Sequence, residues 1–228
     1  MKNTKRKSFA GVLGIAGAVG LLATRPVPAA IADGALPSLE APDLAQGRYA
    51  SMHMLLQKTI LKINIANIDV RFDKPAQSRF TELARDKSYS AALEQQLAPV
   101  AIDAARAVAQ MQFVRDIPLN RWIGVVRDNL EQAREAGLIT REVEQHVGQG
   151  LPGWFATLKD RGYQKGDRVI YAVSPEALRT VVVSAGGQIL VDLSERVPGA
   201  GRVVLASYFA PKSDFREALL RSLLETKR

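Results

Sequence analysis

The chain has 228 residues, of which 47% are hydrophobic and 24% are charged, as in a globular protein rather than a disordered one. It contains no cysteine, which excludes disulfide frameworks, thiol nucleophiles and iron–sulfur clusters. Its two histidines, His53 and His146, leave few ligands for a metal, and we expect neither a metal nor another cofactor. The formal net charge of +8 points first to nucleic acid as a partner.

The first 32 residues have the pattern of a secretory signal peptide. Four basic residues among the first seven precede an uncharged run over residues 9–23, and Ala-Ile-Ala at residues 30–32 offers a cleavage site before Asp33. The run is shorter than the roughly 20 apolar residues of a membrane-spanning helix. We therefore expect a periplasmic or secreted protein with no transmembrane span after cleavage. An uncleaved N-terminal anchor is the alternative.

Signal cleavage changes the charge balance of the chain. Residues 1–32 hold five of the 31 basic residues and none of the 23 acidic ones, so 26 basic and 23 acidic residues remain and the net charge falls to +3. Basic and acidic residues alternate closely from there on, without a basic stripe that contains interleaved aromatic residues. We therefore expect no nucleic-acid partner.

The remaining chain reads as a flexible leader followed by one domain. Residues 33–47 contain two prolines, two glycines and no hydrophobic periodicity, whereas residues 48–228 are patterned throughout. Alternating apolar residues over 52–72 predict a β-hairpin. The apolar side chains change parity within the second strand, which a β-bulge near Ala66 and Asn67 would explain.

Helices occupy the middle of the chain and strands return in its last third. Helical periodicity covers residues 78–86, 91–105, 120–136 and 141–149, the last capped by Thr140 and interrupted at 150–153, with one short strand at 111–115. Strands are predicted at residues 169–173, 178–185, 188–193 and 203–209, before a closing helix with Asp214 and Glu217 as a capping pair. This order predicts an α+β fold, with an antiparallel sheet and helices packed on one face.

One helix face combines apolar and polar groups. Trp122, Val125 and Asn129 are spaced i, i+3 and i+7, so an amide lies beside an indole on a mostly apolar stripe. Asn129 is then either a hydrogen-bonded residue at the edge of the core or a polar group directed into a cleft between helix and sheet.

Four stretches of the chain together resemble the chalcone isomerase family. They are residues 113–138 (FVRDIPLNRWIGVVRDNLEQAREAGL), residues 165–171 (KGDRVIY), residues 174–193 (SPEALRTVVVSAGGQILVDL) and the closing helix with residues 215–220 (FREALL). The order of elements also agrees over most of residues 48–224. The resemblance implies an open-faced β-sandwich, in which a layer of helices covers one face of a large antiparallel sheet and a ligand cleft lies between them.

The resemblance also implies a set of site residues. In the plant enzymes of this family an arginine, a threonine and a tyrosine position a chalcone for ring closure, and the fatty-acid-binding branch also uses an arginine and a tyrosine. At the family's positions this chain has Met52 for the arginine, Asn64 for the threonine, Trp122 for the tyrosine and Val125 for a nearby lysine, and it keeps an asparagine as Asn129. Without the charged group, we expect a protein that binds a small hydrophobic ligand, a lipid or a phenolic compound, without catalysis. The expected cleft residues are Met52, Met54, Asn64, Trp122, Val125 and Asn129.

Two other functions fit the same sequence. The chain could be a working isomerase, an intramolecular lyase in which Arg48 or Lys62 supplies the positive charge after a change of strand register. It could also be a structural or interaction module, for which an exposed apolar patch would be the sign. The sequence specifies neither the ligand nor the oligomeric state.

Overall fold

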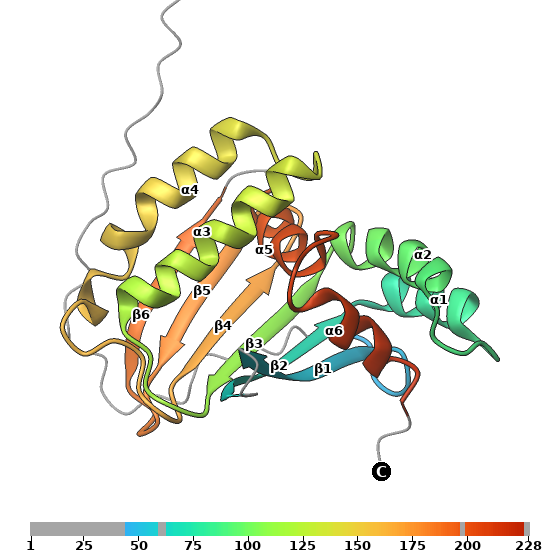
Figure 1. Cartoon of the computed structure of the whole chain (residues 1–228), viewed down its shortest axis with the longest axis horizontal. Helices are drawn as coiled ribbons and strands as arrows, with labels where there is room; N and C mark the ends of the chain where they lie inside the picture. The colour runs from blue at the N-terminus through green and yellow to red at the C-terminus, as the bar shows by residue number, and fades with distance from the viewer. Residues whose placement is uncertain (1–43, 59–62, 197–198, 226–228) are drawn as a thin grey trace, which may run out of the picture. The chain divides into compact units, whose positions relative to one another are not determined.

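A computed structural model describes residues 44–58, 63–196 and 199–225 of the chain. The predicted signal peptide, most of the leader and Lys62 lie outside the described residues. One six-stranded antiparallel sheet has its strands in sequence order, with helices on one face (Figure 1). The elements are β1 (Ser51–Lys58), β2 (Ile63–Phe72), α1 (Lys74–Ala84), α2 (Ala91–Ile102), β3 (Ala107–Phe113), α3 (Leu119–Glu135), α4 (Arg141–Trp154), a 3-10 turn (Ala156–Leu158), β4 (Arg168–Val173), β5 (Leu178–Val183), β6 (Ile189–Glu195), α5 (Ala200–Phe209) and α6 (Arg216–Ser222).

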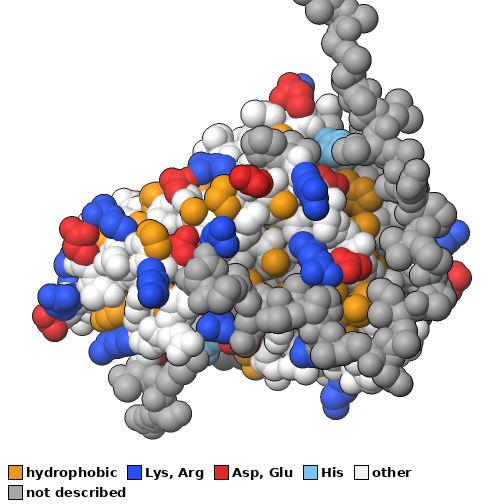
Figure 2. Space-filling view, turned by 180° about the vertical axis from the view of Figure 1, so that it is seen from behind, with side chains coloured by type: hydrophobic (Ala, Val, Ile, Leu, Met, Phe, Trp, Pro, Cys, Tyr) orange, Lys and Arg blue, Asp and Glu red, His pale blue; other side chains and the backbone are white. Residues whose placement is uncertain are grey.

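The two faces of the sheet differ because side chains alternate along each strand. On β3, every second residue from Ala107 to Phe113 is buried on the inner face, toward the helices. The outer face is polar at many positions, and an ion pair between Arg179 and Asp192 joins β5 to β6 at 2.7 Å. Basic and acidic side chains are intermixed over the visible outer surface (Figure 2).

The predicted hairpin is confirmed, with its bulge one residue earlier than expected. Leu56 pairs with Ala66 and Gln57 pairs with Asn64, so Ile65 is the extra residue on β2. The bulge restores the parity that brings Ala66 to the buried inner face, together with the apolar residues that follow it on β2.

The helical layer has two parts. Helix α6 packs on β1, and α2 packs on α1, α5 and α6, above the β1 and β2 half of the sheet (Figure 1). Phe72 of β2 lies in this core, with its ring 5.2 Å from that of Phe80 and 6.3 Å from that of Phe209. Helix α3 packs on α4 and α5 and lies over the other half of the sheet. No helix among the described residues is long and apolar enough to cross a membrane.

The segment 203–209 was predicted as a strand and belongs to helix α5 instead. Nearly all of its residues are buried, and a short apolar run without alternation does not distinguish a strand from a buried helix. Gly201 allows this helix to approach the sheet, because a Cβ atom there would lie only 2.4 Å from Cγ1 of Val173 on β4. The predicted Asp214–Glu217 cap is also wrong, since α6 begins at Arg216 without a side-chain cap.

Helix α4 continues through residues 150–153, where an interruption was predicted. Pro152 has no N–H to donate to the carbonyl of Gly148, four residues earlier. The guanidinium of Arg127 on α3 donates to that carbonyl instead, at 2.8 Å and 3.1 Å. A bond from the neighbouring helix thus replaces the one that proline removes.

Replacement of Asp73 should destabilise the fold measurably. Its buried carboxylate accepts hydrogen bonds at 2.9 Å from the N–H of Ala76, in the first turn of α1, and from the N–H of Arg106, just before β3. We expect Asp73→Ala to lower the free energy of unfolding by about 2 kcal/mol, as measured by urea denaturation. Thr140→Ala, which removes a single exposed cap bond of 3.4 Å on α4, should cost only about 0.5 kcal/mol. Equal losses in the two variants would contradict this account.

Candidate functional site

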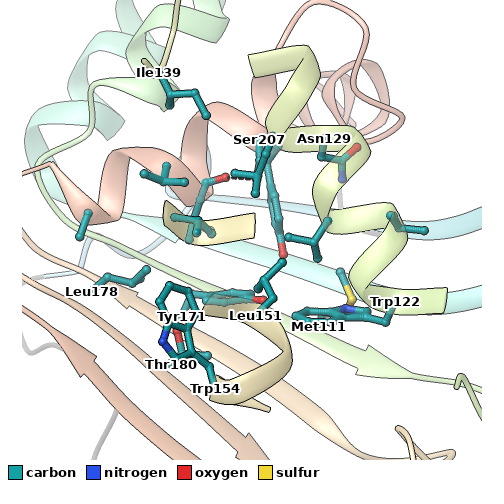
Figure 3. Close-up of a pocket in the computed structure, with 18 of the residues that line it drawn as sticks. Met111, Trp122, Asn129, Ile139, Leu151, Trp154, Tyr171, Leu178, Thr180 and Ser207 are labelled. Atoms are coloured by element: carbon teal, nitrogen blue, oxygen red, sulfur yellow. Dashed lines mark hydrogen bonds between the residues drawn. The ribbon is translucent and has the colours of Figure 1, made fainter. Parts of the chain in front are cut away.

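A cavity of about 680 Å³ lies between the inner face of the sheet and helices α3, α4 and α5 (Figure 3). Its volume is within the roughly 300–1,000 Å³ of small-molecule sites. Strands β3 to β6 supply one wall, with Met111, Tyr171, Leu178, Thr180 and Leu193. The helices supply the other, with Trp122, Val125, Val126, Asn129, Leu151, Trp154, Val204, Ser207 and Tyr208 among others.

Helix α4 covers the cavity with its apolar face. Val143, Val147, Leu151 and Trp154 follow helical spacing and all line the cavity, and only Leu151 among them is fully buried. The others are half-exposed, and of these Val147 and Trp154 pack in part against the core. Gly150 makes room for the Trp154 indole, which would lie 2.4 Å from a Cβ atom at that position.

Three of the residues expected in the cleft line this cavity, and all three lie on α3. They are Trp122, Val125 and Asn129. The Trp122 ring packs edge-on against Phe155, at a centroid distance of 4.9 Å. Asn129 is only 8% exposed, and its amide has no hydrogen bond with any described residue. Of the two interpretations of Asn129, the structure favours the polar group directed into a cleft.

The residues expected from the opening hairpin lie elsewhere. Met52 is buried in the core, Met54 is half-buried against that core, and Asn64 is exposed and accepts a hydrogen bond from Nε2 of Gln57 at 2.8 Å. None of them is among the described residues that line the cavity, to which β1 and β2 contribute only Leu56 and Ile65. Helix α6 packs directly on β1 and fills this half of the sheet, so the open space lies over β3 to β6.

Of the two candidate catalytic cations, Arg48 and Lys62, the structure describes only Arg48. Arg48 lies outside the cavity, with its guanidinium 4.9 Å from the centre of the Tyr49 ring. Lys62 lies outside the described residues. The structure therefore does not bring Arg48 together with Trp122 and Asn129.

Sequence reasoning missed several hydroxyl-bearing residues of the cavity wall, among them Tyr171, Thr180 and Tyr208. Tyr171 and Thr180 are direct partners in neighbouring strands β4 and β5, each flanked on its inner face by apolar residues. A single polar residue on an otherwise apolar strand face was the available signal for both. Tyr208 was hidden because its segment was predicted as a strand.

The ionisable side chains of the cavity other than its tyrosines lie at its mouth. Arg121, His146, Arg202, Glu142 and Asp214 are all exposed, and Glu195 is half-buried. The Arg202 guanidinium is paired with the Asp103 carboxylate. Burial raises the pKa of both Tyr171 and Tyr208 well above 10, so these phenols stay neutral. Among the described residues, no three His, Asp or Glu side chains gather closely enough to hold a metal ion.

Comparison with known proteins identifies the fold and leaves the family unassigned. No protein-family model matches the sequence, and no curated protein matches it either. The structure is similar to the crystal structure of a fatty-acid binding protein from Arabidopsis thaliana, with a TM-score of 0.50 and 12% sequence identity, over 87% of this chain and 92% of that chain. The likeness confirms the predicted α+β fold, an open antiparallel sheet with helices on one face as in the chalcone isomerase family.

The buried tyrosines predict a loss of stability at high pH. The pKa values of Tyr163, Tyr171 and Tyr208 are raised by burial, whereas tyrosines of the unfolded chain ionise near pH 10. The unfolded state therefore releases protons first, and the free energy of unfolding should fall as the pH rises above about 10. Urea denaturation between about pH 9 and pH 11 measures this fall. The fall in the free energy of unfolding should be smaller in Tyr208→Phe than in the unchanged chain. An equal fall in both proteins would show that Tyr208 does not contribute to it.

Proposed function

We propose that the protein binds a small, mostly apolar molecule, a lipid or a phenolic compound, in the cavity beneath α3 and α4, without catalysing its conversion. The observation that carries this proposal is the cavity itself, which has an apolar wall, a few polar groups and, among the described lining residues, charged side chains only at its mouth. The likeness in fold to a fatty-acid binding protein supports it. The absence of a positive charge among the described inner residues favours binding over ring closure, which requires oxyanion stabilisation.

The size of the cavity sets the expected affinity. Burial of about ten methylene groups would contribute roughly 8 kcal/mol, from which the entropy lost on association must be subtracted. We therefore expect dissociation constants weaker than about 1 μM for a single alkyl chain, because roughly 8 kcal/mol before this subtraction already corresponds to about 1 μM.

A variant that fills the cavity should lose the ligand. Native mass spectrometry of the purified protein, after exposure to a lipid extract and to phenolic compounds, should show a bound small molecule. Val125→Trp places a large side chain in the cavity and should abolish this adduct, with the circular dichroism spectrum unchanged. Leu55→Trp makes the same kind of change at a 40% exposed position on the outer face and should keep it. If the unchanged protein retains no ligand at all, the proposed function is wrong.

Export is the second part of this proposal, and the pattern of residues 1–32 supports it. When the full chain is expressed in a Gram-negative host, the product in the periplasm or medium should have the mass of a chain that begins at Asp33. Ala32→Arg should block this cleavage, since the site requires a small residue. Full-length protein retained in the membrane fraction would instead identify the N-terminus as an uncleaved anchor.

A further inference from the structure

The polar groups within the cavity identify the chemistry of the ligand's polar end, an inference that rests on the proposed function. We infer that the ligand is uncharged and carries a hydroxyl or carbonyl oxygen, which binds the hydroxyl cluster formed by Tyr171, Thr180 and Tyr208.

The sheet and α5 bring these three hydroxyl groups to one part of the cavity. Tyr171 and Thr180 are paired in register on the inner face, where directly opposite side chains are about 5 Å apart (Figure 3). Helix α5 packs on β4, the strand of Tyr171, and Tyr208 lies on this helix. The phenols of Tyr171 and Tyr208 are close enough that charge on one would raise the pKa of the other.

None of the three hydroxyl groups has a hydrogen-bond partner among the described residues. Tyr208 is 5% exposed, Thr180 is 7% exposed and Tyr171 is half-buried, and of their oxygens that of Tyr208 is fully enclosed. Most buried hydroxyl groups in proteins are hydrogen-bonded, since an unpaired one is costly. Ser207, beside Tyr208, is by contrast already bonded to the Val204 carbonyl at 2.8 Å. A ligand oxygen would supply an acceptor for the cluster.

The charges around the cavity disfavour an anion at this position. Its basic side chains, Arg121, His146 and Arg202, are exposed at the mouth, and Arg202 is already paired with Asp103. Glu195 lies two residues beyond Leu193, the partner of Thr180, so the nearest charge along this sheet face is negative. A carboxylate bound at the cluster would be buried without a counter-ion, which is strongly unfavourable. The neutral tyrosine hydroxyl groups can donate to an uncharged hydroxyl or carbonyl oxygen, and no charge is then buried.

Matched ligands test this inference directly. Trp122 and Trp154 are the two tryptophans of the chain and both line the cavity, so their fluorescence reports binding. We expect dodecanol to bind at least about tenfold more tightly than dodecanoate at about pH 8, because only the carboxylate carries a charge. The difference in affinity between the two ligands should become smaller toward about pH 5, because dodecanoate becomes protonated and loses its charge.

Variants of the cluster locate the polar contact. Tyr171→Phe and Tyr208→Phe should each weaken dodecanol binding roughly three- to tenfold, as expected for the loss of one hydrogen bond. Thr180→Val, of similar shape, provides a further variant if either phenylalanine variant fails to fold. Tyr163→Phe is the matched control, since the Tyr163 hydroxyl is also buried without a partner but does not line the cavity. It should leave the affinity unchanged.

Three outcomes separate the inference from the function on which it rests. If dodecanoate binds as tightly as dodecanol at about pH 8 and Arg121→Gln weakens it, the polar end lies at the mouth and the inference is wrong. If dodecanol binds but the cluster variants leave its affinity unchanged, the inference is also wrong, although the proposed function stands. If neither these ligands nor any component of the lipid extract binds, the proposed function itself fails.

Discussion

The contact between α5 and β4 determines which part of the sheet is tightly covered and which part is hollow. Seven of the ten residues of α5 are buried, and the helix contacts β4, α2 and α3. Gly201 permits the close approach, since any Cβ atom there would collide with Val173. Two consecutive residues of α5 therefore face different parts of the molecule. Phe209 packs near Phe72 in the filled half of the sheet, and Tyr208 lines the cavity over the other half.

Most of the fold could be predicted from local patterns because its strands are sequential and antiparallel. The alternation of apolar and polar residues over the hairpin and over β4 to β6 identifies these strands. The point where the apolar residues of β2 change from odd to even positions locates the bulge to within one residue of Ile65. Helix α5 could not be identified in this way, since its apolar run is buried on nearly all sides. The continuation of α4 through Pro152 was equally hidden, because it depends on a bond from Arg127, 21 residues away in the chain.

The cavity residues could be predicted from the sequence only where they lie together on a single helix. Helical spacing places Trp122, Val125 and Asn129 on one face of α3, and all three line the cavity. Which strands face them is a matter of tertiary packing. The resemblance directed attention to the hairpin, where Met52 lies in the core beneath α6. The wall is instead formed by β3 to β6, where the available local signal was one polar residue, Tyr171 or Thr180, on an otherwise apolar strand face.

Helix α4, which covers the cavity, and the hydroxyl cluster within the cavity are held in place by different interactions. Helix α4 is fastened to α3 by groups away from the cavity, through the ion pair of Arg134 with Glu144 at 2.7 Å and the bonds from Arg127 to the Gly148 carbonyl. The apolar face of α4 is thereby held over the cavity. The hydroxyl cluster, in contrast, is positioned by β4, β5 and α5. Changes between α3 and α4 should therefore affect whether any apolar molecule fits, whereas changes in the cluster should affect which molecule is selected.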